Sequence, residues 1–70
     1  MRELEQAREA VSQAESKLNQ LKDQLARMPA EPKTDWGKFE QFRLRETIEF
    51  MEGLVEYYTL IRDDLEEGLI

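Results

Sequence analysis

Residues 2–28 have the sequence RELEQAREAVSQAESKLNQLKDQLARM, in which apolar side chains recur at alternating intervals of three and four residues. This spacing is the heptad repeat of helices that pack along one narrow seam. The a positions are Leu4, Val11, Leu18 and Leu25, and the d positions are Ala7, Ala14, Leu21 and Met28. The repeat predicts a helix over residues 2–28, with close helix approach near its N-terminal end, where the d residues are alanines.

The next segment, PAEPKT at residues 29–34, ends this helix. Each proline removes an amide donor and disfavours helical backbone at the residue before it. Thr34 or Asp35 can cap a second helix over residues 35–67, and Gly68 can end it, with Leu69 and Ile70 left to dock or fray. A linker of six residues is a typical length for the connection between two antiparallel helices. The sequence therefore predicts one all-α domain over residues 1–70, an antiparallel two-helix hairpin that can form a four-helix bundle on association.

The composition limits how such a hairpin can be stabilised and what chemistry it can perform. A chain of 70 residues buries little surface, so it usually needs disulfides, a metal or a partner. Cysteine and histidine are both absent from the sequence. Disulfides, the usual zinc and haem sites and the commonest general base are therefore excluded. We expect no enzymatic activity, no cofactor and no small-molecule substrate. We also expect that association with a protein stabilises the hairpin.

Hydropathy and charge indicate where the protein acts and what it avoids. No apolar run approaches the roughly 20 residues of a membrane span, and the N-terminal residues lack the apolar core of a signal peptide. We therefore expect a cytoplasmic protein with no membrane partner. The net charge is −6, and it is uneven: residues 1–45 carry eight acids and nine bases, whereas residues 46–70 carry eight acids and one base. This balance disfavours direct binding to nucleic acid.

Residues 47–61, TIEFMEGLVEYYTLI, contain nine large apolar or aromatic side chains. Projected at about 100° per residue with Met51 at zero, one group lies within about 80° of Met51. Its members are Leu44, Ile48, Leu54, Val55, Tyr58, Ile61, Leu65 and Leu69. Phe39, Phe50 and Tyr57 extend this arc to about −120°. The arc covers nearly half of the helix, more than an ordinary apolar stripe, so the seam of the first helix can cover only part of it.

The uncovered part predicts a docking surface with a core of Phe50, Leu54, Tyr57, Tyr58 and Ile61. Its partner is either a second copy, in a homodimer, or a different helical protein such as a chaperone, in a heterodimer. The chain without its partner should be marginally stable.

Two interpretations stay open for the aromatic residues that begin the second helix. Trp36, Phe39 and Phe42 form a plug at the turn end, or Phe42, between Arg43 and Arg45, joins the partner contact, because aromatic and Arg side chains are favoured interface anchors.

Acidic side chains occupy the opposite side of the second helix: Glu49, Glu52, Glu56, Asp63, Glu66 and Glu67. In an antiparallel hairpin the N-terminal end of the first helix would lie beside the last of these acids and offset their unfavourable position at a helix C-terminus.

The spacing of Glu46, Glu49 and Glu52 has the form of a magnesium-binding ExxE motif, but the first helix supplies no facing acidic pair. Six charges over roughly 27 Å are too sparse to imitate DNA, which shows about 16. We interpret this side as a solubilising face; the alternative is a small acidic inhibitor, for example phage-encoded, acting by protein binding or nucleic-acid mimicry.

One family resemblance rests on the second helix, where Glu46, Ile48, Glu49 and Glu52 form an ExIExxE-like run. Paired aliphatics, Leu54 and Val55, and paired aromatics, Tyr57 and Tyr58, follow it. Over residues 39–62 the chain resembles the small E-type co-chaperones of type III secretion needle proteins. The resemblance implies a helix-turn-helix that docks on a tetratricopeptide-type chaperone and helps to keep a needle subunit monomeric. The regular heptad of residues 2–28 keeps a homodimeric structural coiled coil as an alternative.

Overall fold

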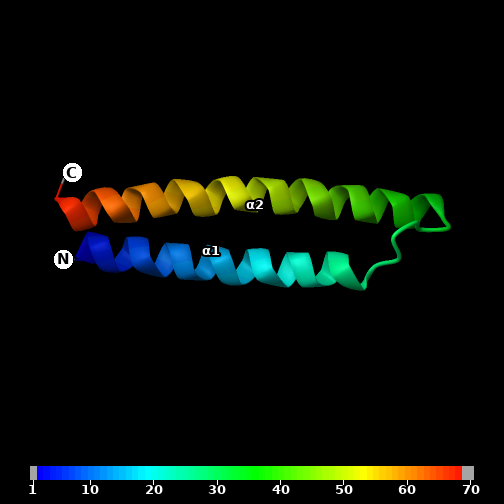
Figure 1. Cartoon of the computed structure of the whole chain (residues 1–70), viewed down its shortest axis with the longest axis horizontal. Helices are drawn as coiled ribbons and strands as arrows, with labels where there is room; N and C mark the ends of the chain where they lie inside the picture. The colour runs from blue at the N-terminus through cyan, green and yellow to red at the C-terminus, as the bar shows by residue number, and fades with distance from the viewer. Residues whose placement is uncertain (1, 69–70) are drawn as a thin grey trace.

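The computed structural model describes residues 2–68 as two antiparallel α-helices, α1 (Arg2–Arg27) and α2 (Asp35–Glu67), joined by one linker (Figure 1). The predicted all-α hairpin is confirmed. α2 has the predicted bounds, whereas α1 ends one residue before the predicted Met28, whose N–H donates to the Leu25 carbonyl at 3.1 Å. The molecule is a rod with principal extents of 51 × 15 × 14 Å, and α1 begins at the end where α2 stops (Figure 1).

The core is one thin stripe between the two helices. The buried residues of α1 are all members of the predicted seam, and each is no more than 8% exposed: Ala7, Val11, Ala14, Leu18 and Leu21. The centre of the core consists of Leu18 and Leu21 of α1 and Ile48 of α2. Four partly buried residues pack against this centre: Leu25, Leu44, Met51 and Val55. The heptad therefore identified the buried face of α1, and α2 meets this face with only part of its apolar arc.

Both ends of α2 have the predicted caps. Thr34 has extended backbone (φ −112°, ψ 155°), and its Oγ1 accepts a hydrogen bond of 3.0 Å from the Gly37 N–H. Thr34, and not Asp35, is thus the N-cap. At the other end Gly68 adopts the left-handed conformation (φ 75°) and its N–H donates to the carbonyls of Asp64 and Leu65. Leu69 and Ile70, predicted to follow the helix, lie outside the described residues.

The two helices differ in length, and the difference lies at the turn end. α2 has 33 residues and α1 has 26, and the N-terminal turns of α2 extend past the end of α1 (Figure 1). The linker is fastened to α2 by Gln41, which is 9% exposed and whose Nε2 donates to the carbonyls of Pro29 (3.1 Å) and Ala30 (3.4 Å). Gly37 lets the linker pack closely, because a Cβ at this position would lie 3.0 Å from the Pro32 Cβ.

The interpretation of Trp36, Phe39 and Phe42 as a plug is wrong. These side chains are 69%, 48% and 61% exposed, respectively. For Trp36 and Phe39 the physical reason is the extension of α2 beyond α1, which leaves the linker and not a helix next to the first turns of α2 (Figure 1). Phe42, by contrast, projects to the side of α2 opposite Met51, away from the core. The Trp36 and Phe39 rings instead pack on each other, with centroids 5.5 Å apart.

Candidate protein-docking face

The two helices differ in what they show to the outside. Outside its seam, α1 contains only polar and charged residues and two alanines, Ala10 and Ala26. The large apolar side chains that are exposed within residues 2–68 all belong to α2: Trp36, Phe39, Phe42, Phe50, Tyr57 and Leu60. The hairpin therefore has an apolar inner face on each helix and a second apolar face on α2 alone.

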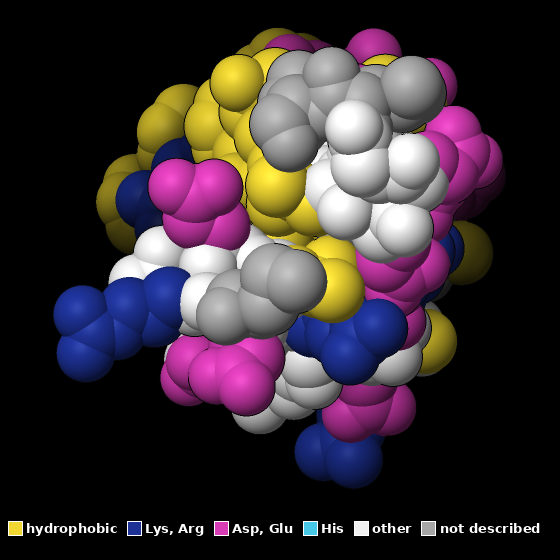
Figure 2. All heavy atoms as spheres, turned by 90° about the vertical axis from the view of Figure 1, so that its left-hand side faces the viewer, with side chains coloured by type: hydrophobic (Ala, Val, Ile, Leu, Met, Phe, Trp, Pro, Cys, Tyr) yellow, Lys and Arg dark blue, Asp and Glu magenta, His cyan; other side chains and the backbone are white. Residues whose placement is uncertain are grey.

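Five of these side chains share one side of α2. Phe39, Phe42, Phe50, Tyr57 and Leu60 fall within a sector about 80° wide when α2 is projected at 100° per residue. Gly53 lies in the same sector, between Phe50 and Tyr57, and we call the six residues the outer face. Viewed along the rod from the end at which the chain begins and ends, hydrophobic side chains gather mainly on one side of α2, and Asp and Glu side chains on the other (Figure 2).

The structure divides the predicted docking residues into two groups. Phe42, Phe50 and Tyr57 belong to the outer face and are 61%, 68% and 59% exposed. Leu54, Tyr58 and Ile61 are half-buried, at the border between the outer face and the contact with α1. The sequence reasoning missed Leu60, which is 58% exposed. Its signal was available, because Leu60 projects to the same angle as Phe42.

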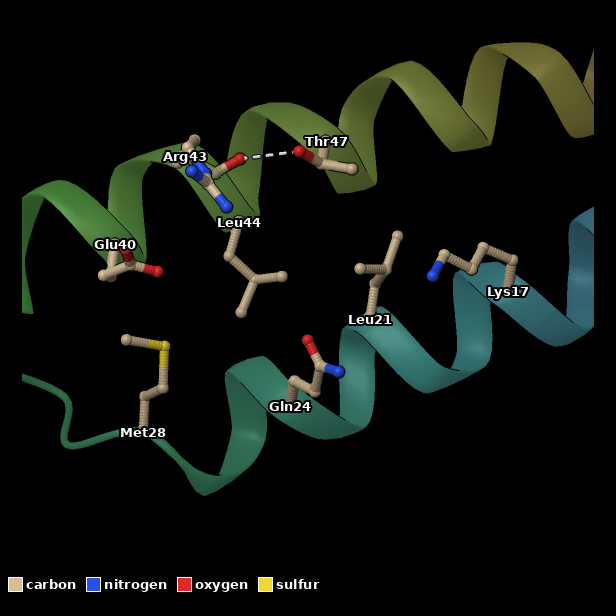
Figure 3. Close-up of a pocket in the computed structure, with 8 residues that line it drawn as sticks. All are labelled: Lys17, Leu21, Gln24, Met28, Glu40, Arg43, Leu44 and Thr47. Carbon is tan, nitrogen blue, oxygen red and sulfur yellow. Dashed lines mark hydrogen bonds between the residues drawn. The ribbon is translucent and has the colours of Figure 1, made fainter.

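A shallow groove runs between the helices along this border. Towards the turn it has a volume of about 330 Å³, and it is lined by Lys17, Leu21, Gln24 and Met28 of α1 and by Glu40, Arg43, Leu44 and Thr47 of α2 (Figure 3). Leu21 and Leu44 point into it from opposite helices (Figure 3). Lys17 also lines a second depression of about 250 Å³, together with Ala10, Gln13, Ala14, Met51, Leu54 and Tyr58. The groove thus has an apolar floor and polar rims.

The opposite, acidic side of α2 makes ion pairs with α1. Arg8 Nη2 lies 3.0 Å from Glu66 Oε1, and Lys22 Nζ lies 3.6 Å from Glu52 Oε2. The first contact confirms the prediction that the N-terminal end of α1 lies beside the acids that end α2. All four side chains are more than a third exposed, so each pair contributes between about 0 and 1 kcal/mol. Two of the six predicted acids are thus engaged within the hairpin.

Three further features of residues 2–68 bear on function: possible metal ligands, buried polar groups and apolar helical segments. Within residues 2–68 no three or more His, Cys, Asp or Glu side chains are placed to hold a metal ion. Every buried side-chain nitrogen or oxygen in that range has a hydrogen-bond partner. Neither described helix contains a segment long and apolar enough to cross a membrane.

Comparisons with known protein families, characterised proteins and solved structures find no match for this chain. Function is therefore inferred from the geometry of the hairpin. Its distinctive surface is the outer face, on which five large apolar side chains are exposed along one side of α2.

Proposed function

We propose that this hairpin is a non-enzymatic protein-binding module, a co-chaperone or adaptor, whose α2 docks on a helical partner. One observation carries the proposal: five large apolar side chains of the outer face are between 48% and 68% exposed on a single helix. A contiguous exposed apolar patch with polar surroundings is typical of an interaction site.

The shape of the outer face favours a helix as the matching surface. From Phe39 to Leu60 it extends roughly 32 Å along α2, at about 1.5 Å per residue, and it is one side chain wide for most of that length. A long, narrow apolar strip is complementary to a second helix or to a groove between helices. Leu54, Tyr58 and Ile61 border the strip and widen the contact towards the groove.

The resemblance to type III secretion needle co-chaperones supplies a specific form of this proposal. Of the residues that carry the resemblance, Ile48 is buried and Val55 packs against the core. Tyr57 lies on the outer face, and Leu54 and Tyr58 lie beside it. In such a co-chaperone these three side chains would contact a tetratricopeptide-type chaperone in the cytoplasm, whereas Ile48 and Val55 would hold the hairpin together.

The test is capture of partners from cells of the source organism with the full chain as bait. A variant with Phe50→Asp and Tyr57→Asp places two carboxylates on the outer face, where both native side chains are mostly exposed. The matched control carries Ser16→Asp and Gln20→Asp on the outside of α1, where both residues are exposed. Circular dichroism checks that both variants keep their helix content.

We expect proteins that bind the native chain and the α1 control to be lost from the outer-face variant, as measured by quantitative mass spectrometry. Retention of the same proteins by the outer-face variant would show that this face is not the binding surface.

A further inference from the structure

We infer that the outer face, whose protein-binding role is the proposal above, has a definite occupant: a second copy of this chain. The two copies lie antiparallel and meet through α2, and Phe50 of each copy packs on Gly53 of the other. This arrangement has twofold symmetry, so the same face serves both copies.

Gly53 is the first observation behind this inference. A glycine in a helix interior costs stability relative to alanine, so it needs a compensating reason. Gly37 has one inside the hairpin, because a Cβ there would lie 3.0 Å from the Pro32 Cβ. A Cβ at Gly53 would meet no atom within 4 Å. Gly53 therefore leaves an open notch on the outer face, where a large side chain of another helix can approach the backbone.

Phe50 is the side chain that matches this notch. It lies three residues before Gly53 on the same face and is 68% exposed. A twofold axis midway between the two positions places Phe50 of each copy over Gly53 of the other, as a knob fills a hole. In a parallel pair Phe50 would face Phe50 and Gly53 would face Gly53, which leaves one crowded and one empty position.

The rest of the outer face is self-complementary about the same axis. In an antiparallel pair the numbers of facing positions then add up to about 103. The facing pairs are Phe39 with Asp64, Phe42 with Leu60, Glu46 with Tyr57, and Phe50 with Gly53. In the two central pairs and the Phe42 pair an aromatic ring thus meets Gly53, Leu60 or, at Tyr57, the Glu46 carboxylate, which comes within reach of the Tyr57 hydroxyl. In the outermost pair Phe39 meets Asp64, whose carboxylate stays at the exposed end of the contact.

Charge along α2 selects the antiparallel orientation. The charges that project beside the outer face are Arg43 near its N-terminal end, Glu46, and Asp64 near its C-terminal end. Antiparallel copies bring Arg43 of one helix near Asp64 of the other, whereas parallel copies would place Glu46 beside Glu46 and Asp64 beside Asp64. Helical side chains lean towards their own N-terminus, so Arg43 leans towards Asp64 of the second copy.

The available area fits a modest dimer formed by α2 alone. Aromatic side chains bury about 150–250 Å² each, so the outer face offers on the order of 500 Å² per copy. Both copies together bury roughly 1,000 Å², which is the lower end for a specific interface. A closed four-helix bundle would also bury Gln13, Lys17 and Gln24, which line the α1 side of the groove. The copies therefore associate through α2, in a concentration-dependent equilibrium.

The first test is sedimentation equilibrium of the purified chain over a range of concentrations. The mass should rise from 8.3 kDa towards twice that value. Gly53→Leu should weaken the dimer by about tenfold or more, because its side chain occupies the place of Phe50 from the second copy. The same change raises intrinsic helix propensity, so the helix content of the diluted chain should not fall. The control, Gln20→Leu on the outside of α1, should leave the dimer unchanged.

The second test fixes the orientation. Arg43→Glu and Asp64→Arg should each weaken the dimer severalfold at low ionic strength, and the double variant should recover most of the loss. A dimer that tolerates Gly53→Leu, or charge variants without mutual rescue, overturns this register.

A chain that stays at 8.3 kDa at every concentration overturns the second copy as occupant. The proposed function would survive that result, because it fails only when the Phe50→Asp and Tyr57→Asp variant keeps its captured partners.

Discussion

The two sides of α2 are both apolar, yet only one of them is covered. Ile48 on the inner side is 8% exposed because it packs against Leu18 and Leu21 of α1. Phe50, two residues later on the other side, is 68% exposed. The two sides differ because α1 has only one apolar stripe, which covers the inner side of α2, whereas α2 has apolar residues on two sides. Hydrophobicity alone therefore does not distinguish a buried residue of α2 from an exposed one; the apolar surface available on α1 decides which residues are buried.

The largest expected effect comes from the same substitution on the two sides. Leu21 is 7% exposed in the core, and Leu60 is 58% exposed on the outer face. We expect Leu21→Ala to lower the free energy of unfolding by about 2–4 kcal/mol, since it removes buried contacts and leaves a cavity. Leu60→Ala should change it by less than about 1 kcal/mol in the dilute protein. Urea denaturation followed by circular dichroism measures both, and equal losses would contradict the division of α2 into a covered and an uncovered side.

A second comparison concerns two glutamines. Gln41 is buried and donates to two linker carbonyls, whereas Gln13 is exposed and bonds only to Glu9 one turn earlier. Gln41→Ala should cost about 1–2 kcal/mol, because the Pro29 and Ala30 carbonyls lose their side-chain partner. Gln13→Ala should be close to neutral. Thermal unfolding of both variants is the measurement, and a neutral Gln41→Ala would show that the linker is not held by this side chain.

Thr34, which caps α2, and Thr47, which lies within it, should respond to substitution in opposite directions. Thr34→Ala removes the N-cap bond to Gly37 and should cost about 1 kcal/mol. Thr47 bonds back to the Arg43 carbonyl at 2.9 Å inside the helix, at an exposed position. Thr47→Ala should raise stability by a few tenths of a kcal/mol, since alanine has the higher helix propensity. Chemical denaturation separates the signs, and a loss at both positions would argue against the capping role.

The smallest effect is expected at the acidic end of α2. Glu66→Gln breaks the ion pair with Arg8, whose side chain is 58% exposed, and should cost no more than about 0.5 kcal/mol at low salt. The neighbouring Glu67→Gln, which removes a carboxylate outside the ion pairs found in residues 2–68, is the control for the change in charge. The difference between the two variants should vanish in about 1 M salt, where charges are screened within roughly 3 Å. A salt-independent difference would point to packing and not to charge.

Much of the hairpin was predictable, because the signals that decide it are local. The heptad identified the buried side of α1, PAEPKT ended that helix, and Thr34 and Gly68 mark the ends of α2. The width of the apolar arc predicted that Phe50 and Tyr57 would be left uncovered, and both are exposed. Leu54, Tyr58 and Ile61, predicted with them, are only half-exposed.

What could not be predicted depends on where one helix ends relative to the other. A projection gives the angle of Trp36 and Phe39 but not the point at which α1 stops beside them, so the expected plug was wrong. Gln41 is a polar residue at the edge of the apolar arc, and its sequence environment contains no sign of burial. Only the path of the linker, which brings the Pro29 and Ala30 carbonyls to its Nε2, makes it a core residue.

The position of Trp36 has an optical consequence. It is the only tryptophan of the chain, it is 69% exposed, and it stacks on Phe39 at the end of the outer face. Its indole is in contact with water in the folded hairpin and in the unfolded chain, so unfolding should shift its emission wavelength little. A molecule that covers the Phe39 end of the outer face excludes this water and shifts the emission to shorter wavelength. The emission wavelength of Trp36 should therefore report the binding of a molecule at this end of the outer face and change little on unfolding.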